Sequence, residues 1–587
     1  MLGTRSEQLG LFEADQLYLD HVGRDSFYGF LATHRQALFR DEDFGILYCR
    51  DNGRPSVPPS LLATALLLQT HDKASDQEAK ERADFDVRWK VALGIDLESR
   101  PFAKSSLQLF RAQLIIHEQA NAIFRKSLAV ARQTGLLKGK KIKVALDTSN
   151  ILGRGAVKDT YNLLADGIVQ LVRVLSGLEA RPPEAWATAN TLARYFTTAS
   201  LKGEAGIDWG NAKARRAFLQ GVVADADRLL ALARATLSGH APGSPASVSL
   251  IAAADLLARL LAQDIERTPD GASIRQAVSR DRVISVHDPE MRHGRKSASK
   301  RFDGHKLSVA VDPDSQVITA VDVLAGNAPD HEGALALVEQ SEQNAAVAVT
   351  ETMGDCAYGD GATRQAFADA DRALIAKVPD RPDTGYFAKE DFVIDLEAMT
   401  CTCPAGQVCQ TVKVHGSGRD DQGAAVRRTV FHFDPAVCGA CPLRGRCVKA
   451  KSGTGRTVSV HPQERLLQAA RALQQSAAFA QYRVHRQAVE HRIARLMQLG
   501  MRQARYRGRV KTRFQLLMAA TVANLTLVAA TMKRLSAHNV IGDALTVPVV
   551  AALSAMVALV SAFGRVSSIT MRHRTLAHYL APLSSCA

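Results

Sequence analysis

The strand-like segments of the sequence constrain the fold most strongly, because they are few and lie far apart among stretches that read as helix. They are 142–146, 305–311, 317–324 and 347–353. Apolar residues recur at every second position in the first segment, and the turn sequence DPDS between the second and third predicts a hairpin. Strand segments that alternate with long helical stretches predict an α/β fold.

Two of these strands end in an aspartate: Asp147 follows 142–146, and Asp355 follows 347–353. A carboxylate at the end of a buried strand is costly unless it is paired, hydrogen-bonded or bound to a cation. Either residue alone also fits a turn, since loop-forming residues follow Asp147. Gly354, Gly359 and Gly361 around Asp355 are expected to permit close approach of a ligand to the backbone.

A third candidate acid lies in a strongly basic stretch of the sequence. The stretch 481–513 holds ten Arg or Lys residues and one carboxylate, Glu490. In a helix, Tyr482, Arg486 and Glu490 fall one turn apart on one face. The alternative is a solvated basic helix in which Glu490 only pairs with Arg486. Three such acids, however, can hold two divalent cations for chemistry on a phosphodiester.

The composition indicates a folded protein with an acidic partner. A chain of 587 residues is long enough for about two to four domains. The formal charge of +15 and a pI near 9.5 favour nucleic acid, although a structural role would also satisfy them. Lys104, Arg111 and Arg125 in the helical N-terminal segment, and a basic loop at 292–301, are candidates for phosphate contacts.

Six of the nine cysteines lie between 401 and 447, in the patterns CTCPAGQVC and CGACPLRGRC. The second pattern resembles a zinc knuckle, and four thiolates suffice for a closed structural site. We expect the zinc ligands to be Cys403, Cys438, Cys441 and Cys447. Free or redox-active thiols are the alternative.

The N-terminus lacks the positively charged residues followed by an apolar stretch that are typical of a signal peptide. We therefore expect no signal peptide and a cytoplasmic protein. Two uncharged runs are long enough to be weighed as membrane spans. We interpret 514–532 as a buried core helix, because it continues the basic stretch and contains Gln515 and Asn524. A lipid span at 544–564, and hence a membrane-associated protein, is the rival interpretation.

Several ordered blocks resemble the DDE-class transposases of bacterial insertion sequences. They are LDTSNILGRGAVKDTYNLL, DPEMRHGRKS, GDCAYGDG, CGACPLRGRC and the helix of Arg486 and Glu490 followed by RYRGRVK. GRPSVPPSLL, SDQEA and RWKVALG resemble the helical domain that opens many of these proteins. The resemblance covers roughly residues 35–530. The glutamate helix departs from the family pattern at Tyr482, which lies one residue farther from Arg486, and at Met497, where the family has Lys or Arg.

The resemblance implies an RNase H-like mixed sheet core with insertions. We expect a helical N-terminal domain at 1–135 and the first part of the core at 139–398, with a helical insertion at about 156–275. A cysteine-rich zinc insertion is expected at 399–450, the closing helices of the core at 455–540, and a tail of unknown role at 541–587.

The resemblance also implies an activity and its partners. Asp147, Asp355 and Glu490 would bind Mg²⁺ or Mn²⁺ and cleave transposon ends, after which the freed 3′ hydroxyl attacks target DNA. The double-stranded DNA would be terminal inverted repeats and target, bound by a homodimer in a bacterial nucleoid. We expect DNA contacts from Arg292, Arg295, Lys296, Arg486, Arg502, Arg505, Arg507, Arg509 and Lys511. The alternative is a noncatalytic DNA-binding protein derived from a transposase.

Overall fold

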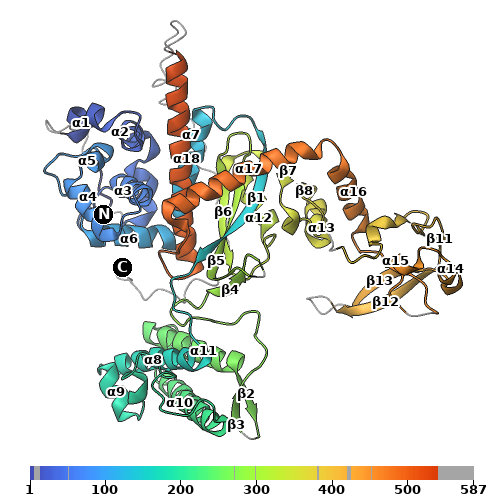
Figure 1. Ribbon diagram of the computed structural model, residues 1–587. Helices are drawn as coiled ribbons and strands as arrows, with labels where there is room; N and C mark the ends of the chain where they lie inside the picture. Colours follow the sequence, from blue (N-terminus) through green and yellow to red (C-terminus); the bar gives the residue numbers. More distant parts are fainter. Residues whose placement is uncertain are drawn as a thin grey trace.

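The computed structural model describes residues 1–5, 13–49, 52–269, 271–297, 299–379, 383–419, 425–450 and 453–539. The tail predicted at 541–587, including the uncharged run 544–564, lies outside these residues. Figure 1 shows helical N-terminal elements and a small cysteine-rich module on opposite sides of a twisted sheet, with a second group of helices below it.

Within the described chain, a six-stranded mixed sheet forms the centre of the molecule. Its strands are β1 (Lys141–Leu152), β4 (Arg292–Arg295), β5 (Arg301–Val311), β6 (Ile318–Ala325), β7 (Ala348–Met353) and β8 (Ala373–Ile375). β1 pairs antiparallel with β5 and parallel with β7, and β8 extends the parallel side. β6 and β4 both pair antiparallel with β5. The predicted strands, the β5–β6 hairpin and the mixed α/β class are therefore confirmed.

The first strand is longer than predicted. β1 does not end at Asp147 but continues to Leu152, and Asp147 lies opposite Val309 of β5. The parallel register with β7 ends earlier, where Ala145 lies opposite Met353. The polar residues after Asp147 extend the strand because the long β5 supplies partners for their backbone groups, which local turn preferences do not reveal.

The N-terminal domain is helical. Its elements are α1 (Ala14–Val22), α2 (Phe27–Leu38), η1 (Asp41–Leu47), α3 (Pro59–His71), α4 (Asp76–Phe85), α5 (Val87–Leu93), α6 (Lys104–Ile116) and α7 (Ala120–Gln133). Ser75 caps α4 in a reciprocal capping box with Glu78, so the helix begins at Asp76. α5 follows directly as a separate helix, because the Asp86 side chain begins it by accepting a hydrogen bond from the Arg88 amide.

The helices α12 (Ala334–Ala345), α17 (Phe479–Leu496) and α18 (Arg509–Asn539) pack against the sheet, and a π-helical turn, η5 (Met497–Met501), follows α17. α18 also contacts α3 and α7, so one apolar core continues from the N-terminal domain into the sheet. The run 514–532 is confirmed as a buried core helix, in which Leu516, Ala519 and Val522 are fully buried.

A helical insertion follows β1 (residues 153–284). It contains α8 (Thr160–Leu178), α9 (Pro183–Ala189), η2 (Ala193–Tyr195), α10 (Ala212–Leu237), α11 (Pro245–Asp264), β2 (Ile265–Thr268) and β3 (Gly271–Ile274). These elements enclose an apolar core of their own around Trp186 and Leu257. By length and composition alone, α11 and α18 of the described chain would also suit a membrane span, but such apolar helices are equally typical of protein cores.

The cysteine-rich module (residues 387–460) contains two small antiparallel sheets. Its elements are η4 (Lys389–Asp391), β9 (Val393–Asp395), β10 (Thr400–Thr402), β11 (Val408–Cys409), β12 (Val412–Arg419), β13 (Ala425–His432), α14 (Pro435–Gly439), α15 (Arg444–Cys447) and β14 (Thr457–Ser459). Phe392, Phe431 and Phe433 form the centre of its core. α13 (Gly361–Asp369) and α16 (Glu464–Gln475) lie between this module and the sheet (Figure 1).

Asn524 ties α18 to the sheet, and its replacement tests the central packing. Its buried side chain accepts a hydrogen bond from the Ile318 amide and donates one to the Ile318 carbonyl, both at 2.9 Å. We expect Asn524→Leu to lower the free energy of unfolding by about 2–4 kcal/mol, because both backbone groups lose a buried partner.

Urea denaturation measures this loss. The matched control is Thr526→Ala, which removes a hydroxyl that donates to the Ala523 carbonyl oxygen of its own helix and should cost under about 1 kcal/mol. Equal losses in the two variants would contradict the role assigned to Asn524.

Candidate active site

The register between β1 and β7 brings the two predicted aspartates to neighbouring positions. Ala145 lies opposite Met353, and Asp147 and Asp355 each follow two residues later. Side chains alternate along a strand, so a step of two residues returns to the same face. Asp355 has left β7 and caps η3 (Cys356–Tyr358), where it accepts a hydrogen bond from the Ala357 amide at 2.8 Å. Both aspartates therefore lie just beyond the point where the parallel pairing of β1 with β7 ends, Asp147 within β1 and Asp355 in the turn after β7.

Glu490 approaches this end of the sheet from α17. The helix packs across β1 and β5, as Figure 1 shows. The Arg486 guanidinium donates to the Glu490 carboxylate at 3.5 Å, which is the pairing that the alternative interpretation of this helix predicts. The Glu490 side chain keeps 58% of its surface exposed. It is therefore accessible to a ligand that arrives from solvent.

The three acids share one electrostatic environment. Burial raises the pKa of Asp147 to about 6, and the nearby carboxylates of Asp355 and Glu490 act in the same direction. The Thr148 amide, which donates to Asp147 at 2.7 Å, and the Arg486 guanidinium oppose this rise. A buried carboxylate whose ionisation is disfavoured beside two other acids is typical of functional sites, where a cation relieves the repulsion.

These acids would supply only some of the ligands that a metal ion requires. Among the described residues, no three His, Cys, Asp or Glu side chains are grouped closely enough to hold a metal ion by themselves. Mg²⁺ is usually held through one or two carboxylates, while water and substrate phosphates supply its remaining oxygen ligands. Asp147 and Asp355 at adjacent strands fit a site of this kind.

The glycines around Asp355 leave room for neighbouring groups of the chain, and the prediction that they permit approach of a ligand stays a prediction. A Cβ atom would lie 2.6 Å from the Tyr358 ring at Gly354, and 2.0 Å from the Lys377 carbonyl oxygen at Gly359. At Gly361 it would lie 2.4 Å from the His461 ring. Gly354 thus makes room for Tyr358, a buried residue of the site that sequence reasoning missed. Its position three residues after Asp355 was the available signal.

The predicted DNA contacts divide into exposed and internally bonded residues. Those exposed to solvent are Arg295, Lys296, Arg502, Arg507, Arg509 and Lys511, of which Arg509 also pairs with Glu290 at 3.5 Å. Arg295 lies on a β-ribbon, since the predicted basic loop is formed by β4 and the start of β5. Arg292 instead donates to the carbonyl oxygens of Pro289 and Met291, at 2.7 and 2.8 Å, and burial lowers its pKa. The structure therefore does not support a phosphate contact for Arg292.

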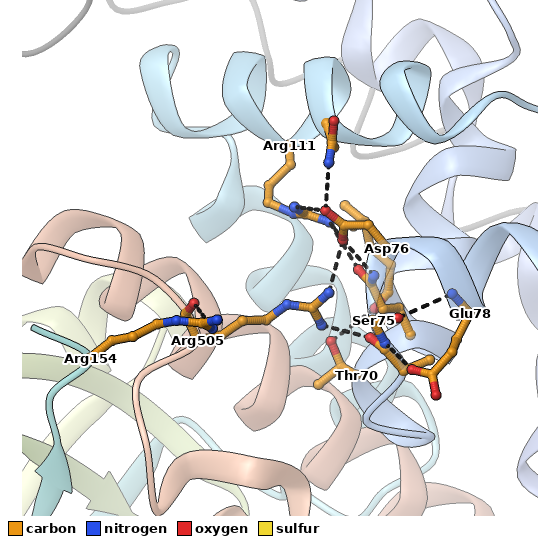
Figure 2. Close-up of polar contacts among 11 residues, drawn as sticks. Thr70, Ser75, Asp76, Glu78, Arg111, Arg154 and Arg505 are labelled. Atoms are coloured by element: carbon orange, nitrogen blue, oxygen red, sulfur yellow. Dashed lines mark hydrogen bonds and ion pairs between the residues drawn. The ribbon is translucent and has the colours of Figure 1, made fainter. Parts of the chain in front are cut away.

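Arg505 and Arg111 also bond within the protein, as Figure 2 shows. Both guanidinium groups bind the Asp76 carboxylate, at 2.8 and 2.7 Å, and Arg505 donates to the Ala74 carbonyl oxygen at 2.7 Å. Burial opposes ionisation of Asp76, but hydrogen bonds from Arg111 and its neighbours hold the pKa of this carboxyl well below its usual range. Both arginines were predicted as phosphate contacts. Arg505 instead fastens the N-terminal domain to the segment after α17, whereas Arg111 joins α6 to α4 within that domain.

Two family models match the chain at separate regions. The model described as "Transposase DDE domain" matches residues 402–529, which include Glu490 and most of α18. The model described as "Transposase domain (DUF772)" matches residues 18–113 in the N-terminal domain. The two matches together support a DDE-class transposase of insertion-sequence type. No curated protein and no solved structure matches the chain.

The clustered cysteines of the transposase fall into two sets. Cys401 and Cys409 are buried opposite each other in β10 and β11, and burial raises the pKa of Cys401 to about 11. The other set lines a cavity of about 30 Å³ and consists of Cys403, Cys438, Cys441 and Cys447. These are the four predicted zinc ligands, although in the described part of the chain their sulfur atoms are not close enough together to hold an ion.

The metal-free transposase should become more stable when Asp147 is replaced by Asn. The pKa of Asp147 is about 6 in the folded protein and 3.8 ordinarily, so the native state binds this proton more tightly and loses stability as the pH rises through 6. We expect Asp147→Asn to exceed wild type by about 2–3 kcal/mol at pH 7.5 and by roughly 1 kcal/mol at pH 4.5.

Urea unfolding without divalent ions, at several pH values, measures this difference. Asp369→Asn, at an exposed position at the end of α13, should show no comparable pH dependence. A gain for Asp147→Asn that is equal at both pH values would contradict the effect of burial on this carboxylate.

Proposed function

We propose that the transposase cleaves DNA at the ends of its element and joins them to target DNA, with Asp147, Asp355 and Glu490 as metal-binding acids. The main support for this proposal is the pairing of β1 with β7, because Asp147 and Asp355 each follow the last paired residues by two positions. The contact of α17, the helix of Glu490, with β1 is a second support. The strand order β6–β5–β1–β7–β8 supports an RNase H-like core, with the first acid on the central strand and the second after its parallel neighbour.

Each residue has a part in this reaction. Asp147 and Asp355 would hold Mg²⁺ or Mn²⁺ at the scissile phosphate, with Glu490 as a further ligand. Such paired ions activate the attacking oxygen and stabilise the leaving oxygen. Arg486, 3.5 Å from Glu490, would orient that carboxylate. Water would attack at the transposon end first, and the freed 3′ hydroxyl would then attack the target.

The exposed cations fit a double-stranded DNA partner. The Leu152 amide at the end of β1 donates to the Arg502 carbonyl oxygen at 3.0 Å, so the basic segment that starts at Arg502 lies beside the strand that carries Asp147. Arg507 and Lys511 follow on the same exposed segment. Because an element has two ends, we infer that two copies of the chain act together on terminal inverted repeats.

Substitution of the acids tests the proposed reaction. We expect Asp147→Asn, Asp355→Asn and Glu490→Gln each to reduce cleavage of inverted-repeat DNA in Mg²⁺ by at least about a thousandfold, because each removes a metal ligand. DNA binding, measured by gel shift, should persist. Asp369→Asn serves as the matched control and should cleave normally.

A single acid variant that cuts at the wild-type rate would remove that residue from the site. A wild-type protein that binds inverted-repeat DNA but leaves no nick in Mg²⁺ or Mn²⁺ would support the noncatalytic alternative instead.

We also infer that the cavity in the cysteine-rich module takes a structural Zn²⁺ ion. Four thiols around one small cavity provide the donor set of a closed zinc site. Burial raises the pKa of Cys447, and the nearby Cys438, Cys403 and Cys441 add to this effect. The thiols would have to turn toward a common centre when the ion binds.

Zinc analysis tests this site. We expect about one zinc per chain in freshly purified protein, and its loss in Cys438→Ser or Cys447→Ser. Cys409→Ser is the matched control and should retain the ion, because Cys409 belongs to the buried pair outside the cavity. Less than half a zinc per chain in wild type would contradict the site.

A further inference from the structure

Two histidines of the cysteine-rich module bring their ring nitrogens together. The Nε2 atoms of His415 in β12 and His432 in β13 lie 3.0 Å apart, and the ring centroids are separated by 5.2 Å. His415 is exposed and His432 is partly exposed, so solvent reaches the pair. Figure 1 shows both strands on the far side of α13 and α16 from the central sheet. The pair is therefore remote from the catalytic acids, and the proposed reaction gives it no role.

The pairing of β12 with β13 places both histidines on one face of the ribbon. His415 lies opposite Arg428, and the His432 amide donates to the Thr411 carbonyl oxygen at 2.9 Å. Paired residues share a face, and His432 follows Arg428 by four positions, so its side chain returns to the face of His415. The adjacent Phe431 is fully buried in the core of the module. The histidines therefore lie on the outward face, at backbone positions that the ribbon fixes.

The separation of the two nitrogens fits either a hydrogen bond or two ligands of one metal ion. Two N–H groups directed at each other would repel, so at least one Nε2 carries a free lone pair. Two imidazole nitrogens bound to one ion at about 2.0–2.1 Å, with an angle of roughly 90–110° between them, lie about 2.9–3.4 Å apart. The observed 3.0 Å falls within this range. Small rotations of the two rings would direct both lone pairs at one ion.

The surroundings of the pair determine which ions it suits. The exposed side chains of Lys413 and Arg428 belong to the same face of the ribbon. Among the described residues, no third His, Cys, Asp or Glu completes a metal site with the pair. Mg²⁺ and Ca²⁺ require oxygen ligands, so a basic face without a carboxylate ligand disfavours them. Imidazole instead binds Zn²⁺, Ni²⁺ and Cu²⁺, and water can occupy their remaining positions.

We propose that His415 and His432 form a second metal site, which binds Zn²⁺, Ni²⁺ or Cu²⁺ through both Nε2 atoms and joins β12 to β13. The site uses neither the three acids nor the cysteine cavity, so it does not rest on the proposed reaction or on the proposed zinc site. Histidine ordinarily titrates near about pH 6.5, so both rings are free to bind a metal ion at about pH 7.5. An ion that binds the folded ribbon stabilises the native state.

Nickel binding tests this site. Equilibrium dialysis of the zinc-loaded, full-length protein against Ni²⁺, with excess Mg²⁺ present, should show about one Ni²⁺ per chain in addition to the zinc. His415→Gln should raise the Ni²⁺ dissociation constant at least about tenfold, because one of two imidazole ligands is lost. The Gln amide can still donate a hydrogen bond to His432. His117→Ala, at an exposed histidine just after α6, is the matched control and should bind Ni²⁺ as wild type does.

Urea unfolding gives a second measurement. Ni²⁺ should raise the urea midpoint of wild type and of His117→Ala but not that of His415→Gln. If the pair is only hydrogen-bonded, wild type and His415→Gln will bind Ni²⁺ equally or not at all, and the proposal is overturned. Displacement of the ion by Mg²⁺ would also overturn it. If the purified protein holds no zinc, the proposed zinc site fails, whereas the Ni²⁺ comparison still decides the role of the histidines, because both proteins carry the same cysteines.

Discussion

The parallel pairing of β1 with β7 is the constraint on which the rest of the structure depends. Adjacent strands lie about 4.8 Å apart, so the register of Ala145 with Met353 brings Asp147 close to Asp355 although the residues are far apart in the chain. Pairing of β1 with β5 on its other side holds Asp147 within a continuous strand. The backbone positions of the two aspartates are thus set by hydrogen bonds of the sheet, and motion of the side chains does not change them.

The third acid depends on a different set of contacts. The segment after α17 pairs with the end of β1, since the Ala504 amide donates to the Leu152 carbonyl oxygen at 2.8 Å. The next residue, Arg505, binds Asp76 of the N-terminal domain, and Arg154 donates to the Arg505 carbonyl oxygen at 2.9 Å (Figure 2). The helix of Glu490 therefore ends in a segment held from two sides. This arrangement gives the N-terminal domain a structural connection to the candidate site.

Sequence patterns predicted what local chemistry determines. The strand periods and the helix of Arg486 and Glu490 each depend on residues close in the chain. The extension of β1 past Asp147 depends on the distant β5, so turn preferences alone were misleading. Arg111 and Arg505 were misassigned to DNA for a similar reason: a charge shows that a partner is required, but only the fold reveals that this partner is Asp76.

The attachment of the helical insertion has a consequence for evolution. The insertion leaves the sheet just after β1, where the Gly153 amide still donates to the Asp303 carbonyl oxygen of β5 at 2.8 Å, and the chain returns through β4 against the same part of β5. Its two ends are thus anchored next to each other, and its apolar core is separate from that of the sheet. Such a segment can change in length without moving the strands that carry the acids, because surface insertions with adjacent ends are tolerated by the fold that they leave.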